Sequence, residues 1–332
     1  MHNRDKILIT VVVMISAALL LSQHQNFVLA APGTTEGGFD RSFNVNGPVK
    51  LNIENSSGSV NVQRGGSAKV EIHARIKSNN WFSGDATEQI KKIEQNPPVQ
   101  QQGNTIRISK PEPNEIFNHV SISYEISVPE ETEIQSSTGS GSQTIDGVKG
   151  PVDVRSGSGS VKLSNIGSSV AARTGSGSVT LEQIKGGADL ETGSGSIRAE
   201  GVAGGSKMRA GSGGITLRQT APGDVAVETG SGHIRLEGVE GSLIAHAGSG
   251  GMEVDGRPKG EWELHSGSGS IEARTSDTGL DLYARTSSGS VNVESPITME
   301  SSASNRHEVR GKIRGGGTRM EVTTGSGSIH IQ

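Results

Sequence analysis

Residues 174–181 read TGSGSVTL, and the same pattern returns as TGSGSIRA at residues 192–199 and as TGSGSIHI at residues 324–331. A flexible linker is also rich in glycine and serine, but it keeps no fixed spacing. Here the first glycine of each copy, the corner glycine, recurs in steps of 18 to 20 residues, and a last step of 38 fits two periods across a degraded copy near Arg306. A short fixed period indicates stacked structural repeats. The corner positions are Gly139, Gly157, Gly175, Gly193, Gly211, Gly230, Gly248, Gly267, the substituted Ser287, and Gly325.

The residues on either side of each corner alternate between apolar and polar side chains. Apolar residues stand three before, four after and six after the corner, as Val154, Val161 and Leu163 do around Gly157. Alternation with period two is typical of strands with one buried face. A single unit cannot bury that face, but units stacked edge to edge enclose a continuous core. The sequence therefore predicts an all-β fold, a β-solenoid (β-helix) of 18–19-residue coils.

Small residues occupy the corner, and we expect two reasons for this. Each coil bends above the bend of its neighbour, so bulky side chains would collide, and glycine also adopts positive φ without a steric penalty. Serine or threonine precedes the corner in most copies, with the inward parity of the core. Its hydroxyl can satisfy backbone groups that the bend frees. We expect a small, hydrogen-bonded end to the core at Thr138, Ser156, Thr174, Thr192, Thr229 and Ser266.

The first third of the chain follows the plan less regularly. LNIENSSGSVNV at residues 51–62 aligns with the repeat, and KVEIHARI at residues 69–76 alternates as a strand does. Asp85 as a cap and Pro97 as a stop predict one short helix over residues 85–95. We predict a signal peptide at residues 1–30, N-terminal β-rich coils at 31–135 whose helix caps the solenoid, and the GSGS-repeat solenoid at 136–332.

The first thirty residues have the pattern of a secretory signal peptide. Arg4 and Lys6 precede an apolar run over residues 7–21, and small residues before Ala31 permit cleavage after Ala30. We expect export to the periplasm, the cell surface or the medium, with an uncleaved N-terminal membrane anchor as the alternative. The chain has no cysteine, which excludes disulfides, and its net charge of −4 gives no sign of nucleic-acid binding.

The whole pattern resembles the bacterial DUF4097 family of adhesin-like proteins with β-strand repeats. The likeness is carried by VKLNIENSSGSVNV at residues 49–62, by ISYEISVPEETEIQSSTGSGS at residues 122–142 and by units such as SGSGSVKL at residues 156–163. It spans roughly residues 39–332. Family members carry an acidic residue in the second half of the corner, where this chain has serine. The resemblance implies a β-solenoid at the cell envelope, brings no catalytic residue, and includes relatives associated with envelope-stress regulation.

The residues themselves favour binding over catalysis. No nucleophile elbow, nucleotide-binding loop or metalloprotease motif occurs. We therefore expect a non-enzymatic interaction module of the envelope or surface, with no catalytic residue, cofactor or metal. An outward column two residues before the corner predicts either a solvated charge ladder or a stripe for anionic envelope polymers or glycans, and a basic cluster follows near the C-terminus. The candidate ligand contacts are Arg155, Arg173, Arg209, Arg285, Arg306, Arg310, Lys312, Arg314 and Arg319.

Two other functions stay open. An outward column seven residues after the corner is mainly acidic, which fits a solvated face or the carboxylates of a polysaccharide-active β-helix enzyme. The second open function is an accessory role in envelope-stress sensing. The acidic residues are Asp146, Glu182, Glu200, Glu237, Asp255 and Glu294.

The C-terminal coil predicts a further contact. SIHIQ at residues 328–332 reads as a core strand at the very end of the printed chain. A strand at the open end of a solenoid carries unpaired N–H and C=O groups, which are a template for another strand. We therefore expect weak self-association through this coil.

Overall fold

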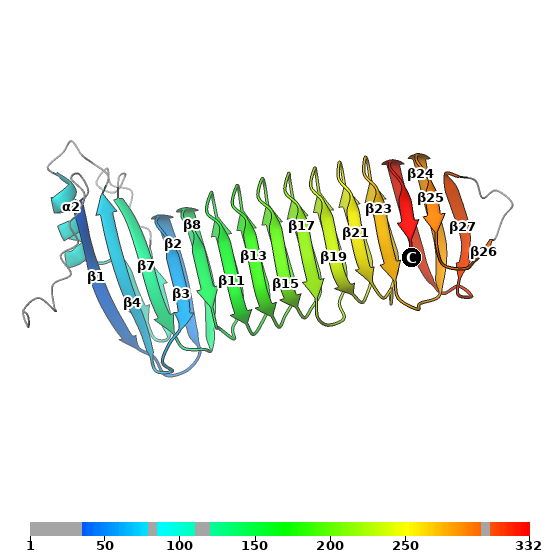
Figure 1. Cartoon of the computed structure of the whole chain (residues 1–332). Coiled ribbons are helices and arrows are strands. Elements are labelled where there is room, and N and C mark those ends of the chain that lie inside the picture. Colours follow the sequence, from blue (N-terminus) through cyan, green and yellow to red (C-terminus); the bar gives the residue numbers. More distant parts are fainter. Residues whose placement is uncertain (1–34, 79–84, 110–119, 300–305) are drawn as a thin grey trace, which may run out of the picture.

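The computed structural model describes residues 35–78, 85–109, 120–299 and 306–332, so the predicted signal peptide lies outside the described residues. Two long sheets face each other and form an elongated rod, which Figure 1 shows from the side. Within these described residues, sheet A has 14 strands and sheet B has 15. The predicted all-β solenoid is confirmed, and its apolar side chains form one continuous core along the rod.

In the middle of the rod, each coil gives one strand to sheet B and the next strand to sheet A. Neighbouring coils pair in parallel and in register, so Leu163, Leu181 and Ala199 stand side by side. The strands of sheet B are β8 (Thr132–Ser140), β10 (Val152–Ser156), β12 (Val170–Thr174), β14 (Ala188–Thr192), β16 (Ser206–Ala210), β18 (Val225–Thr229), β20 (Leu243–Ala247) and β22 (Trp262–Ser266). Those of sheet A are β9 (Gln143–Asp146), β11 (Val161–Ile166), β13 (Val179–Ile184), β15 (Ile197–Val202), β17 (Ile215–Gln219), β19 (Ile234–Val239), β21 (Met252–Gly256) and β23 (Ile271–Thr275).

Close contact between neighbouring coils, the first of the two expected reasons, explains the glycines at the corners. A Cβ atom at Gly175 would lie 2.5 Å from the carbonyl oxygen of Gly157, and one at Gly177 would lie 2.0 Å from that of Gly159. The backbone of the neighbouring coil therefore leaves no room for a side chain. Positive φ was the wrong reason for these middle coils, since neither Gly175 nor Gly177 adopts a left-handed conformation.

The threonine before the corner closes the core as expected. Thr192 is buried, its hydroxyl donates to the Gly177 carbonyl at 2.8 Å, and it accepts from the Gly195 N–H at 3.1 Å. Thr174 repeats both bonds one coil earlier, with Gly159 and Gly177. The hydroxyl thus links its own corner to that of the preceding coil.

At the N-terminal end the coils no longer follow sequence order. The coil of β2 (Val49–Ser57) and β3 (Val60–Arg64) lies between the β8/β9 coil and the strands β6 (Thr105–Ile108) and β7 (Val120–Val128). Antiparallel strands complete the end. Both sheets continue across residue 135, so the coils on its two sides share one core. The elements are β1 (Thr35–Asn44), β2 (Val49–Ser57), β3 (Val60–Arg64), β4 (Lys69–Ser78), α2 (Asp85–Gln95), β5 (Val99–Gln102), β6 (Thr105–Ile108) and β7 (Val120–Val128).

The predicted helix is confirmed as α2, and it packs on β1, the edge strand of sheet A. Ile90 and Ile93 are buried in the core, and Glu94 Oε1 accepts a hydrogen bond from the Gly38 N–H at 2.9 Å. The helix therefore covers the N-terminal end of sheet A (Figure 1). Within the described residues, no helix is long and apolar enough to cross a membrane.

The C-terminal end corrects the expectation for the last strand. Ile329 pairs with Ile271 on one side and with Val291 on the other, so the final coil is not an edge. Instead of a degraded copy of the repeat, the residues after Arg306 form a strand antiparallel to its neighbour. The strands are β24 (Leu280–Ser288), β25 (Val291–Val293), β26 (Ile297–Met299), β27 (Glu308–Ile313), β28 (Thr318–Ser326) and β29 (Ile329–Ile331).

Candidate functional site

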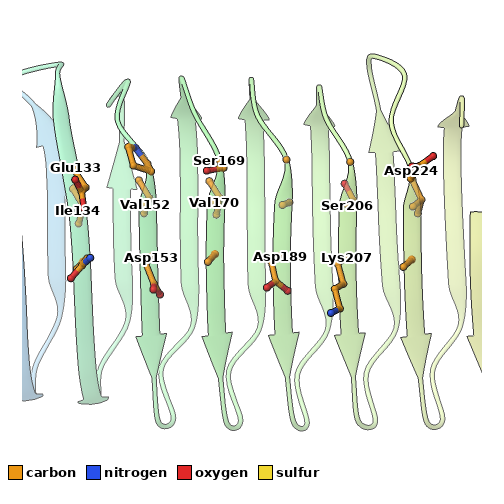
Figure 2. Close-up of a pocket in the computed structure, with 18 of the residues that line it drawn as sticks. Glu133, Ile134, Val152, Asp153, Ser169, Val170, Asp189, Ser206, Lys207 and Asp224 are labelled. Carbon is orange, nitrogen blue, oxygen red and sulfur yellow. The ribbon is translucent and has the colours of Figure 1, made fainter. Parts of the chain in front are cut away.

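A groove with a volume of about 750 Å³ lies on the outer face of sheet B. It crosses the strands from β8 to β20, so its long direction follows the rod (Figure 2). Side chains on several successive coils line it together. A ligand that fills the groove must therefore be extended, because no single coil forms a pocket of its own.

Small residues create this hollow. Ala171 and Ala226 stand four residues before their corners, where the coils nearest to them carry Asp153, Asp189 and Lys207. Gly187 and Gly205 stand at the starts of the adjacent strands and add no side chain above the sheet. Because the outward positions of neighbouring coils are in register, short side chains on several coils merge into one continuous depression.

Charged groups line the groove at intervals. Figure 2 shows Asp153, Asp189 and Lys207 in one row across the strands. Asp153 Oδ2 accepts from Arg155 Nη2 at 2.9 Å, while Asp153 Oδ1 is buried and has no hydrogen-bond partner among the described residues. Lys207 forms no ion pair within the part of the chain that the structure describes. The groove thus offers both a carboxylate acceptor and an ammonium donor to a ligand.

One end of the groove is apolar. Ile244 is 47% exposed, and it is the one large hydrophobic side chain that the described residues leave exposed. It lies on β20 in the same outward column as Ala226 and Lys207. An exposed isoleucine that continues an apolar groove marks a surface suited to contact with a ligand.

Three of the predicted arginines lie beside the groove. Arg155 and Arg173 are register neighbours and line a smaller hollow of about 460 Å³ on the same face. Arg173 Nη2 is 3.1 Å from Asp189 Oδ2, and Arg209 Nε is 3.3 Å from Glu228 Oε2. Arg173 and Arg209 thus each form an ion pair with an acidic side chain of a neighbouring coil, while contact of these arginines with a ligand stays a prediction.

The other predicted arginines and the lysine lie at the C-terminal end of the rod, apart from the groove. Arg310 stacks over the Tyr283 ring, 4.8 Å from its centroid, and Arg319 Nη1 is 3.2 Å from Glu261 Oε1. Lys312 stands in register with Asp281. The residues assigned to this end are Arg285, Arg306, Arg310, Lys312, Arg314 and Arg319.

Two residues of the acidic column on sheet A, Glu182 and Glu200, pair with basic side chains of neighbouring coils. Glu200 Oε2 is 3.1 Å from Arg218 Nε, and Lys162 Nζ is 3.0 Å from Glu182 Oε1. The Ser164 hydroxyl and the Asn165 amide hydrogen-bond to Asp146 and hold its pKa below the ordinary value. His246 and His265 meet edge to face, but no group of three potential metal ligands occurs within the described residues.

The charged residues of the sequence do not indicate this groove. The informative pattern was the lack of side chains in an outward column. Pro151, Ser169, Gly187 and Gly205 stand six residues before their corners, and Ala171 and Ala226 stand four before theirs.

Comparison with known proteins identifies the family. The profile of the family described as Toastrack DUF4097 matches residues 49–332. A "putative adhesin" from Bacteroides fragilis is 13% identical, with 91% of this chain and 98% of that chain covered and a TM-score of 0.35. A "putative cell adhesion protein" from Clostridium sporogenes is 10% identical, with 89% and 99% covered and a TM-score of 0.19. A search of curated proteins gave no match. Because the profile covers most of its length, the chain belongs to the Toastrack DUF4097 family.

Proposed function

We propose that the protein is an exported, non-enzymatic binding module of the cell envelope and that it holds an extended envelope glycan in the groove of sheet B. The observation that carries this proposal is the groove itself, which crosses the strands from Glu133 on β8 to Ile244 on β20. Strands in a sheet are spaced by about 4.8 Å, so seven strands correspond to roughly 30 Å of extended ligand.

The chemistry of the lining suits a polyhydroxylated chain. Asp153 and Asp189 can accept hydrogen bonds from hydroxyl groups, and Lys207 can donate them. The short apolar side chains of Ala171 and Ala226 allow the C–H faces of sugar rings to approach the sheet. Arg155 and Arg173 stand beside the groove, where they would meet anionic substituents of the same polymer.

Three carboxyl groups outside the groove, all with a lowered pKa, do not favour hydrolysis. A glycosidase needs a carboxylic acid whose pKa is raised, opposite a second carboxylate. Within the described residues, the resolved carboxyl shifts all go downward. Lys149 lowers the pKa of Glu130, the Ser164 hydroxyl lowers that of Asp146, and Lys259 lowers that of Glu240. These groups therefore stay ionised at neutral pH and cannot serve as general acids.

The test is binding of the mature chain to soluble peptidoglycan strands and to a polyanionic wall polymer, measured by calorimetry. Ala171→Trp should fill the groove and weaken binding at least tenfold. Thr180→Trp is the matched control, since Thr180 points outward on sheet A in the same coil. Equal binding by the two variants, or no binding of either polymer by the unaltered chain, would overturn the proposal. Loss of glycan from the reaction mixture would instead support an enzyme.

Two further experiments test export and the alternative role in envelope-stress sensing. Cell fractionation should place the mature chain outside the cytoplasm, and deletion of residues 1–30 should retain it inside. A stress-responsive reporter that changes when the chain is deleted, but not when Ala171→Trp is introduced, would favour the sensing role over glycan binding.

A further inference from the structure

The final coil, residues 318–332, occupies a slot between two coils that precede it in the sequence. In sheet B, β28 lies between β22 and β24, and in sheet A, β29 lies between β23 and β25. The register is continuous across the insertion, because Thr323 pairs with His265 on one side and with Arg285 on the other. In Figure 1 the C-terminus accordingly lies inside the row of strands and not at its end.

This coil can leave without disturbing the path of any other segment. Within the described residues, one link after Ile313 joins this coil to the strands before it, and β22 and β24 form no strand pair with each other. Departure of the coil would therefore open a slot one coil wide, with unpaired strand edges on both sides. Such edges favour pairing with another strand.

The slot has a demanding shape. It must receive Met320 and Val322 from one strand and Ile329 and Ile331 from the other, all of which are buried. The Thr324 hydroxyl also donates to the Gly269 carbonyl at 2.8 Å. A segment that satisfies both sheets at once, with the corner in place, is the same coil of a second copy.

A hinge precedes the coil. Arg314, Gly315 and Gly316 adopt φ of 50°, 87° and 88°, and a Cβ atom added at Gly315 would meet no other atom within 4 Å. Three consecutive glycines, Gly315 to Gly317, connect β27 to β28. Because glycine adopts many backbone conformations at little cost, this link can turn back as it does here or extend to another molecule.

We propose that residues 318–332 form an exchangeable coil, which inserts into the slot of a second copy and gives a reciprocal domain-swapped dimer. Exchange of an identical element preserves every contact of the slot and changes only the hinge. This proposal is independent of the glycan groove. It also replaces association through an open edge at Ile329 and Ile331, because the structure shows that strand paired on both sides.

The test uses the absence of native cysteine. One full-length chain carries only His265→Cys and the other only Thr323→Cys, at positions whose side chains are hydrogen-bonded at 2.8 Å. Neighbouring strands place such pairs within the Cα separation that a disulfide requires. The two chains are denatured, mixed, refolded together and oxidised. A swapped coil should give a disulfide-linked heterodimer whose yield rises with the protein concentration during refolding.

Two controls make the result decisive. Arg209→Cys mixed with Thr323→Cys samples the same outward column several coils away and should give only background linkage. Deletion of Gly315 and Gly316 shortens the hinge and should raise the dimer fraction severalfold in light scattering. A heterodimer yield no higher than that of the Arg209→Cys control would overturn the proposal, as would a hinge-deleted chain that folds and stays monomeric at high concentration.

Discussion

The middle of the rod and its two ends are built by different rules. From β10 to β23 the coils follow sequence order, pair in parallel and repeat the same corner. At each end, a coil near the chain terminus lies between coils that are not its neighbours in sequence, and antiparallel strands follow outside it. The coil β2/β3 does this at one end and β28/β29 does it at the other. Identical repeats are enough to build the middle of the rod. Its two ends also need inserted coils and antiparallel strands that close the stack.

The difference follows from the edges of the sheets. A parallel stack that simply stops leaves a full coil edge exposed, which invites association. Here the chain instead turns back, so that β4 pairs antiparallel with β1, and β27 pairs antiparallel with β24. Helix α2 then covers the edge strand β1. The middle therefore depends on identical close contacts, whereas the ends depend on individual side chains and irregular connections.

The largest predicted effect distinguishes glycines in these two settings. Gly193→Val should destabilise the fold by about 3 kcal/mol or more, because its Cβ would lie 2.4 Å from the Gly175 carbonyl oxygen. Gly66→Val is the matched change near the N-terminal end, where a Cβ meets nothing within 4 Å. Urea denaturation followed by circular dichroism should show a large difference between the variants. Equal midpoints would contradict the close-contact account of the corner.

A second prediction compares buried side chains in the two regions. Leu190→Ala in β14 and Ile93→Ala in α2 each remove a fully buried side chain and should each cost about 2–5 kcal/mol. The two variants should differ in which strands show raised hydrogen exchange. Leu190 stands in register between Ala172 and Met208, so its loss should raise hydrogen exchange across several middle coils. Loss of Ile93 should raise exchange mainly in β1 and β4. Identical exchange maps would refute this distinction.

The repeat could be predicted because period-two alternation and a fixed step are local properties of the sequence. The order of coils at the ends could not, since any coil can pair with any other of the same shape. One signal was present: the step from Gly267 to Ser287 is 20 residues, the longest single step. Residues 276–279 there connect β23 to β24 across the slot that β28 and β29 fill. The groove could not be predicted from the repeat for a related reason. It depends on small outward residues that occur in several neighbouring coils at once.

A third, smaller effect concerns the hydroxyl that closes each middle coil. Thr192→Val keeps the shape of the side chain but removes its bonds to the Gly177 carbonyl and the Gly195 N–H. Leaving these buried groups unpaired should cost about 1–3 kcal/mol. Thr180→Val, on the outer face of β13, should change stability by less than about 0.5 kcal/mol. If the two variants unfold at the same urea concentration, the hydroxyl does not support the corner.

The smallest effect lies at the start of the middle region and depends on pH. Asp146 of β9 accepts hydrogen bonds from the Ser164 hydroxyl at 2.6 Å and from Asn165 Nδ2 at 2.7 Å, and these hold its pKa below the ordinary value of 3.8. A carboxyl whose pKa is lower in the folded state stabilises the fold above its unfolded-state pKa and loses that contribution as the pH falls through the folded-state pKa. Asp146→Asn should therefore lower stability at pH 7 by less than about 1 kcal/mol, since the group is largely solvated.

The same difference should shrink as the pH is lowered below 3.8, where the native carboxyl also becomes neutral. Ser164→Ala separates the hydrogen bond from the charge, because it removes the largest contribution to the lowered pKa. In that background, Asp146→Asn should cost less than it does in the unaltered chain. Denaturation curves for the four proteins of this cycle, from pH 7 to pH 2, provide the measurement. A cost of Asp146→Asn that stays constant over this range would show that the carboxylate charge adds nothing to the junction between β9 and β11.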